Sequence, residues 1–438
     1  MNKVLLILSV FLFTVILFLI DDYTIIGEVY FYILTFLCVR DFIKRKTITL
    51  FNIWNGAFIF IILSEVFIPT YEKGDSNTIT ALIFIITANN IVNLGYFLTK
   101  IVYVKQRVNK LELLKNIKTG NILIYGLILI YVFYSGEVAI NRFLLGRSNI
   151  NTNDNVIYLS FISSLGLLLP SIIAFYFTVK RKKSVMSSVF LSLPIFILLF
   201  FGGSRFPLLF SFFSFLLVIL GKEFYKLEYK TLLKLSFAVL LLLFSSSIMK
   251  NFRTFGFNNQ YDFSTNTDVV AKPSLAFIAS SYMSPEGVID MTSLMFKYFS
   301  VNDHMYGKSS SFLLYFWIPR SLWKEKPTML GHWFIRKHRS GFSDGHSTSF
   351  GFVGDLYADF GLFSLFFVYF IGRLLRWAEV KKDNLLKGDS SLRIIGAMIF
   401  PYCFFFVRSP ITSTMNFLGI LLMYFIIKRF LFKTYING

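Results

Sequence analysis

The chain has 438 residues, of which 55% are hydrophobic and only 16% are charged, and its mean hydropathy is +0.64. Soluble globular domains carry about 25% charged residues, so this composition excludes an ordinary soluble protein. The formal net charge of +20 would indicate nucleic-acid binding in a soluble protein. In a membrane protein, cytoplasmic loops facing anionic head groups account for a basic excess, so we expect no nucleic-acid partner.

Apolar runs recur along the whole chain, and each is close to the about 20 residues that a helix needs to cross a bilayer. They predict an all-α fold, a polytopic integral membrane protein with about twelve transmembrane helices. The first run is too long for a signal-peptide core and lacks a small-residue cleavage site, so we expect it to be retained. The predicted helices cover residues 3–20, 24–39, 49–69, 78–98, 121–139, 156–178, 185–202, 206–221, 231–248, 350–372, 392–407 and 411–427.

The distribution of basic residues predicts the topology. With the N-terminus in the cytoplasm, the cytoplasmic segments hold 26 Lys and Arg, against five in the short external gaps. The positive-inside rule therefore places both termini in the cytoplasm. We predict nine helices over residues 1–248, a large external loop over 249–349 and three helices over 350–438, all within one membrane domain.

The predicted external loop contains all four histidines of the chain and several tryptophans. Its aromatic content argues against disorder, and a loop of this length without spans of its own is usually functional or disordered. Stretches such as "SFLLYFWIPRSLW" look amphipathic. We expect them to form interfacial helices on the membrane surface.

Two arginines stand at predicted external turns just before a helix. Arg205 occurs in "FFGGSRFPLL" and Arg408 in "FFFVRSPITS". A guanidinium beside the free N–H groups of a helix start suits a phosphate or pyrophosphate. The alternative is an interfacial arginine that snorkels to water, and the local sequence leaves both interpretations open.

A basic stretch follows in the external loop, over residues 317–341, with a single acid among six basic residues. It suits either a phosphate group or a plain patch facing anionic lipid. The basic residues of this stretch are Arg320, Lys324, Lys326, Arg336, Lys337 and Arg339.

The segment "SDGHSTSFGFVGDLYADFG" leads from the loop into the next span. His346 could accept a proton from a substrate hydroxyl, or it could be a solvated loop histidine. Asp355 and Asp359 are spaced i, i+4 at the opening of a helix, where interfacial acids are functional candidates or complement the helix N-terminus. No metal-binding pattern and no phosphate-binding loop is present, so we expect no metal and no cofactor.

Taken together, these motifs resemble the Wzy-type O-antigen and capsule repeat-unit polymerases. The resemblance rests on the late external loop, on "GSRFPLL", on "IPRSLWKEKP" and on Gly354, Tyr357 and Gly361 in "GFVGDLYADFG". It covers much of the C-terminal half, whereas the first 180 residues match only in hydropathy.

The resemblance implies a metal-independent membrane glycosyltransferase at the outer face of a bacterial inner membrane. Its donor and acceptor would be undecaprenyl-pyrophosphate-linked glycans, and a chain-length regulator and a flippase would be its partners besides membrane lipids. His346 is then the first candidate for the general base and Asp355 the second. The candidates for binding the pyrophosphate are Arg205, Arg320, Arg408, Lys326, Arg336 and Arg339.

Other functions stay open at this point. An O-antigen ligase would share the arginines and the loop base and differ only in its acceptor. A lipid-linked oligosaccharide flippase would carry charges at mid-bilayer and repeat symmetry. A membrane receptor or structural protein would use the basic loop only to bind anionic lipid.

Overall fold

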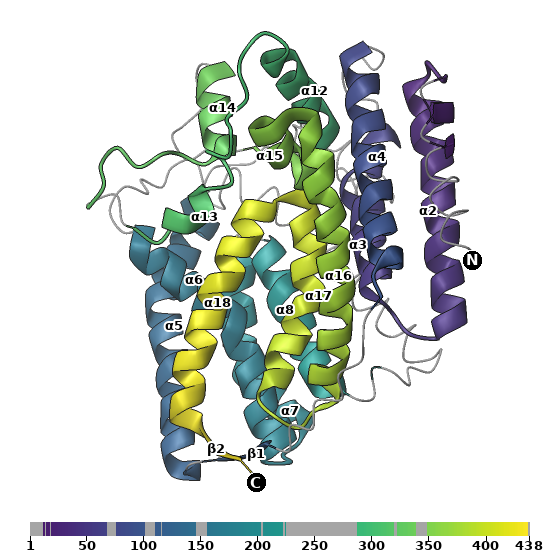
Figure 1. Cartoon of the computed structure of the whole chain (residues 1–438). Helices are drawn as coiled ribbons and strands as arrows, with labels where there is room; N and C mark the ends of the chain where they lie inside the picture. Colours follow the sequence, from purple (N-terminus) through teal and green to yellow (C-terminus); the bar gives the residue numbers. More distant parts are fainter. Residues whose placement is uncertain are drawn as a thin grey trace, which may run out of the picture. The chain divides into compact units, whose positions relative to one another are not determined.

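The structure is a computed structural model, and helices dominate it (Figure 1). It describes residues 12–13, 15–17, 19–67, 76–100, 110–114, 116–145, 156–202, 205–221, 224, 287–318, 322–338 and 348–436. The helices are α2 (Tyr23–Arg45), α3 (Leu50–Ile61), α4 (Ser76–Leu98), α5 (Ile117–Leu145), α6 (Val156–Ile173), α7 (Val185–Phe201), α8 (Arg205–Leu220), α12 (Val288–Phe299), α13 (Phe312–Tyr315), α14 (Leu330–His338), α15 (Gly351–Phe360), α16 (Ser364–Lys387), α17 (Leu392–Arg408) and α18 (Pro410–Leu431). The described elements also include two short strands, β1 (Lys110–Leu114) and β2 (Phe432–Ile436), two 3-10 helices (Leu63–Phe67 and Gly361–Phe363) and a π-helix (Ala174–Lys180).

Six described helical segments are long and apolar enough to cross a membrane. They confirm the prediction of a helical membrane protein, whereas the number of twelve spans and the topology stay predictions. The helices α7 and α8 are apolar but shorter, and α2 is helical without being one of the six. The predicted span 231–248 and most of 3–20 lie outside the described residues. The six segments are Leu50–Phe67, Ser76–Leu98, Ile117–Asn141, Ile162–Lys180, Gly351–Lys387 and Pro410–Leu431.

The predicted helix over residues 350–372 falls within the candidate span Gly351–Lys387, and the structure shows that this span is interrupted. The helix α15 ends at Phe360, a 3-10 turn follows, and α16 begins at Ser364 and continues to Lys387. The break is at Gly361, whose φ of 57° and ψ of −138° leave the helical region. Glycine adopts this conformation without the steric cost that a Cβ would bring.

Contacts between residues divide the chain into two compact units. The first unit contains residues 1–102, 279–380 and 403–415, and the second contains 103–278, 381–402 and 416–438. The helices α16, α17 and α18 each contribute to both units. The predicted division at residues 248 and 349 stays a prediction.

In the second unit, α6 packs against α8, and α5 packs against α7. Close approach is possible where Gly166 of α6 faces the ring of Tyr131 on α5. The strands β1 and β2 pair antiparallel, with Lys110 opposite Ile436 and Leu114 opposite Phe432. This pairing joins two segments that the topology predicts on the same, cytoplasmic side.

In the first unit, α2, α3 and α4 share a buried network of side chains that we call the amide interface. Trp54 Nε1 donates to Asn89 Oδ1 at 2.8 Å, and Asn89 Nδ2 donates to the Tyr30 hydroxyl at 3.0 Å and to Asn55 Oδ1 at 3.1 Å. Asn55 and Asn93 exchange two hydrogen bonds of 3.0 Å. The amides of the network lie within two candidate spans, where hydrogen bonds between neighbouring helices satisfy buried polar side chains.

The helices α12, α14 and α15 form the second core of this unit, which we call the aromatic cap (Figure 1). Buried side chains from all three helices pack together, and α12 also lies along α4, where Phe84 and Phe296 meet with ring centroids 5.2 Å apart. Apolar burial of this kind stabilises the cap. The buried residues of the cap are Met291, Met295, Phe299, Leu330, Phe334, Phe350 and Ala358.

Candidate functional site

The sequence candidates divide into those that the structure describes and those that it does not. Asp355, Lys326, Arg336 and Arg408 are described, and all four belong to the first unit. Arg205 begins α8 in the second unit, but its side chain is outside the described part. The remaining three candidates lie outside the described residues, namely Arg320, Arg339 and His346.

The short helix α15 carries two carboxylates, one turn apart, at the junction of the predicted loop and span. Its first residue, Gly351, has a φ of 72°, and a Cβ there would meet Val288 of α12 at 2.8 Å. Phe352 then packs against Trp54, with ring centroids 5.1 Å apart, and against Phe58 at 6.3 Å. The aromatic contacts therefore fix α15 against α3, close to the start of α12.

The motif residues Gly354, Tyr357 and Gly361 are packing residues in this structure. Gly354 faces Phe350 and Thr292, where a Cβ would collide with the phenylalanine. The Tyr357 ring packs edge-on against Phe84 and Phe296, with centroids 5.3 and 4.2 Å apart. The motif thus holds α15 against α4 and α12, and Gly361 ends the helix.

Asp359 is buried and anchors the segment between α12 and α13. Its carboxylate accepts hydrogen bonds from Ser309 N at 2.9 Å, from Ser310 N at 2.7 Å and from Ser310 Oγ at 2.6 Å. Two further bonds run from Met305 N to Ala358 O at 2.8 Å and from Tyr306 N to Asp359 O at 3.0 Å. Asp359 lies at the C-terminal end of α15, so it does not complement the N-terminus of this helix.

Asp355 differs from Asp359 although it is only one turn away. Its side chain is partly buried, and within the described part of the chain it has no hydrogen-bond or ion-pair partner. Asp359 is the charged group that interacts with it electrostatically. A carboxylate in such a place is free to accept a proton from, or donate one to, a bound molecule.

Sequence reasoning missed Glu65, which joins α3 to the aromatic cap. Glu65 follows α3 in a 3-10 turn, and its carboxylate accepts from Val288 N at 2.6 Å and from Ile289 N at 2.9 Å. These are the first N–H groups of α12, which have no partner inside the helix. Gly287, the residue before α12, allows this approach because a Cβ would collide with the carboxylate. The one available signal was an acid at the end of an apolar run.

Arg408 lies at the same end of the first unit as Glu65. It is the last residue of α17, it interacts electrostatically with Glu65, and its carbonyl accepts a hydrogen bond from Ser349 Oγ. The preceding carbonyl, Val407 O, is 3.5 Å from the position of a Cβ on Gly351. The structure therefore places the Arg408 backbone beside the start of α15, the helix that carries Asp355.

A phenol also belongs to this end of the unit. Burial, together with the nearby carboxylates of Glu65 and Asp290, raises the pKa of Tyr23 well above its ordinary value. Tyr23 is the first residue of α2, so it adds a neutral hydroxyl beside the start of α12.

The described basic residues of the loop have different surroundings. The Lys326 ammonium is buried, donates to Phe316 O at 2.7 Å and to Ile318 O at 2.9 Å, and lies 5.2 Å from the Phe312 ring centroid. Arg336 is exposed on α14. Lys326 therefore holds backbone carbonyls of its own loop, and its predicted contact with a phosphate stays a prediction, as does that of Arg336.

Within the described residues, no group of three or more His, Cys, Asp or Glu side chains could hold a metal ion. The site instead consists of the Asp355 carboxylate and of Arg408 at the C-terminal end of α17. The carboxylates of Glu65 and Asp359 hold the surrounding backbone through hydrogen bonds. Comparison of the chain with protein-family models, with curated proteins and with solved structures finds no match, so the family resemblance rests on the sequence motifs alone.

Proposed function

We propose that this protein is a membrane glycosyltransferase that joins undecaprenyl-pyrophosphate-linked repeat units into a surface polysaccharide, an O-antigen or a capsule, at the outer face of the bacterial inner membrane. The proposal is supported by the sequence motifs and by the helices that are long and apolar enough to cross a membrane. The observation that carries it is the Asp355 carboxylate, which has no partner among the described residues and stands on a helix that begins beside Arg408.

The residues have distinct roles in this proposal. Asp355, with His346 as the other candidate, removes the proton from a hydroxyl of the incoming repeat unit. The oxygen then bonds to the anomeric carbon of the growing glycan. The bond from that carbon to the pyrophosphate oxygen breaks, and undecaprenyl pyrophosphate leaves with the electron pair. Arg408 stabilises the negative charge on the leaving group. Arg205, in the second unit, is a separate candidate for this role that rests on the sequence alone.

The experiment that tests the function is deletion of the gene, followed by electrophoresis of the surface glycans. A polymerase predicts glycans of one repeat unit on the acceptor, and the plasmid-borne gene restores the ladder. An undecorated acceptor would indicate a ligase or a flippase instead, and an unchanged ladder would contradict all three functions.

Complementation with variants tests the arginines. We expect Arg205→Ala and Arg408→Ala proteins to reach the membrane in normal amounts but to leave glycans one repeat unit long. Arg376→Lys is the matched control. Arg376 is also a basic residue of the first unit, but its guanidinium donates a hydrogen bond to the Tyr96 hydroxyl near the C-terminal end of α4. Wild-type chain lengths in either alanine variant would remove that arginine from the mechanism.

A further inference from the structure

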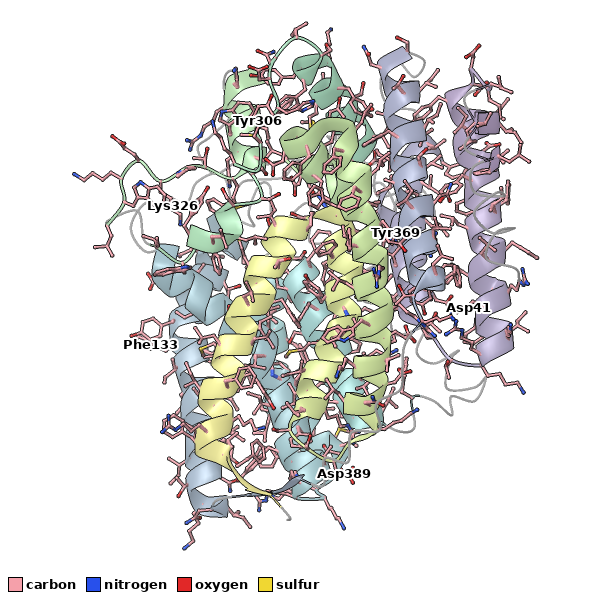
Figure 2. The ribbon with its side chains drawn as sticks, viewed as in Figure 1. Asp41, Phe133, Tyr306, Lys326, Tyr369 and Asp389 are labelled. Carbon is pink, nitrogen blue, oxygen red and sulfur yellow. The ribbon has the colours of Figure 1, made fainter. Side chains whose placement is uncertain are left out.

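The loop that follows α12 presents a tyrosine ring to solvent. We call residues 301–308 the cap loop (Figure 2, where Tyr306 is labelled). Tyr306 is 75% exposed, and within the described part of the chain its ring contacts no other aromatic ring and its hydroxyl makes no hydrogen bond. An exposed tyrosine offers a rigid, amphipathic contact area to a bound molecule, because it has only two side-chain torsions to immobilise.

The backbone of the cap loop makes a tight turn around Tyr306. Lys308 N donates to Met305 O at 3.1 Å, and the two residues between them, Tyr306 and Gly307, have φ angles of 50° and 86°. Two central residues with positive φ are typical of a type I′ turn, which Gly, Asn and Asp adopt readily and other residues adopt at a steric cost. The turn therefore does not explain the tyrosine, and a residue that fits its backbone poorly is expected where function requires its side chain.

Two hydrogen bonds hold the turn on the C-terminal end of α15. Met305 N donates to Ala358 O at 2.8 Å, and Tyr306 N donates to Asp359 O at 3.0 Å. The Met305 side chain also packs against the aromatic cap. The position of Tyr306 is therefore set by α15, the helix that carries Asp355.

Three groups of the site follow one another along α15. The first residue of the helix, Gly351, lies beside the Arg408 backbone, Asp355 is near the middle, and Tyr306 is bonded at the other end. A helix of this length measures about 15 Å, which several sugar rings can cover. A glycan whose reacting end lies at Asp355 can therefore place a later sugar ring at Tyr306.

The polar side chains of the cap loop suit a hydroxylated ligand. Asn302, Asp303 and Lys308 are exposed, and within the described part of the chain neither Asp303 nor Lys308 has an ion-pair partner. They provide donors and acceptors for sugar hydroxyls, while the C–H face of a sugar ring can pack on the face of the Tyr306 ring. The acid and the lysine have opposite charges, so the loop does not have the basic excess that anionic lipid attracts.

We propose that Tyr306 packs on a sugar ring of the glycan substrate, and that the cap loop is a subsite that holds the glycan away from the reacting bond. The proposal rests on the function proposed above, because that function supplies the glycan. It explains why the turn contains a tyrosine in spite of the steric cost, since the ring is needed at the outer surface.

Calorimetric titration of the full-length protein in nanodiscs tests the subsite. The probe is an oligosaccharide of a few repeat units, released by mild acid from the surface polysaccharide of the same bacterium, so that no pyrophosphate and no lipid is present. The variants are Tyr306→Asn, which suits the turn but removes the ring, and Tyr306→Phe, which keeps the ring. Tyr32→Ala is the matched control, because Tyr32 is a tyrosine of α2 that is 67% exposed.

We expect Tyr306→Asn to bind the oligosaccharide about tenfold more weakly than the wild type, and Tyr306→Phe and Tyr32→Ala to bind it nearly as well. The midpoint of unfolding by sodium dodecyl sulfate should stay the same or rise in Tyr306→Asn, because asparagine adopts positive φ more readily. Wild-type affinity in Tyr306→Asn, a lower midpoint in this variant, or no binding by the wild-type protein would overturn the proposal.

Binding and polymerisation fail separately in this experiment. Asp355→Asn should bind the oligosaccharide as tightly as the wild type although it does not polymerise. If deletion of the gene leaves the glycan ladder unchanged while the oligosaccharide binds and Tyr306→Asn weakens that binding, the subsite is correct and the polymerase function is wrong. If deletion gives single repeat units but Tyr306→Asn binds normally, the function stands and the subsite is wrong.

Discussion

The aromatic cap and the amide interface bury polar groups in different ways. In the cap, the carboxylate of Glu65 accepts hydrogen bonds from backbone N–H groups at the start of α12, and that of Asp359 accepts them from Ser309 N and Ser310 N. In the amide interface, side-chain amides bond mainly to one another, and neither helix ends nor charges are involved. The cap therefore depends on single carboxylates, whereas the interface distributes its hydrogen bonds over several amides.

Asp355 differs from three other acids of the first unit in whether its carboxylate accepts hydrogen bonds from the backbone. Glu65 and Asp359 each hold two backbone N–H groups, and Glu379 accepts from Leu50 N at the start of α3. Asp355 holds none of the described backbone. If the comparison is correct, substitution of Glu65, Asp359 or Glu379 lowers the stability of the protein. Substitution of Asp355 then lowers only its activity.

The largest effect is expected for Asp355→Asn on glycan polymerisation. Loss of a general base costs roughly 10²–10⁴-fold in rate, while the free energy of unfolding should change by no more than about 0.5 kcal/mol, since no described contact is lost. The rate is measured with a purified lipid-linked repeat unit in proteoliposomes. His346→Ala is the parallel variant. A near-normal rate for Asp355→Asn together with a large loss for His346→Ala would assign the base to His346.

The next effect is on stability, in Asp359→Ala. Two backbone N–H groups and the Ser310 hydroxyl lose their acceptor, and each unsatisfied buried group costs about 1–3 kcal/mol, so the variant should lose about 3 kcal/mol or more. Unfolding by sodium dodecyl sulfate in mixed micelles measures the difference. Asp355→Ala is the matched control on the same helix. Equal stability of the two variants would contradict the anchoring role of Asp359.

Glu65→Ala should have a smaller effect, about 2 kcal/mol, because two N–H groups at the start of α12 lose their acceptor. Glu65→Gln keeps one acceptor oxygen at this place, so its free energy of unfolding should fall by less than that of the alanine variant. The same micelle titration compares them. If the glutamine variant is as unstable as the alanine variant, charge rather than hydrogen bonding holds α12, and the parallel with Asp359 fails.

The sequence was sufficient to predict the helical membrane class, because apolar runs are a local signal. It also singled out Asp355 as an acid at a span boundary, and the role of Asp355 stays a prediction. It was not sufficient for Glu65, whose partner N–H of Val288 is 223 positions later in the chain. The break at Gly361 was also missed, since "ADFGLFSLFF" reads as one apolar run and hydropathy carries no information on a backbone angle.

The candidate basic residues show a similar limit. Arg408 was chosen for its turn and for the helix that follows it, and the structure places its carbonyl beside Ser349. Lys326 was chosen for its charge, yet its ammonium contacts two carbonyls of its own loop. Composition cannot separate these cases, because the distinction depends on which way a side chain turns within a folded loop.

The smallest effect is expected in the amide interface, for Asn89→Ala. This variant loses the bonds from Trp54 and to Tyr30 and Asn55, yet hydrogen bonds between membrane helices are worth about 0.6 kcal/mol on average, so we expect a loss of about 1–2 kcal/mol. Asn93→Ala, which removes only the exchange with Asn55, should lose less. Because the remaining amides and the Tyr30 hydroxyl can bond to each other, no single residue of this interface should reach the cost of Asp359→Ala. A loss in Asn89→Ala as large as that in Asp359→Ala would show that the interface also depends on one residue, and that the two regions do not differ in the way that their hydrogen bonds indicate.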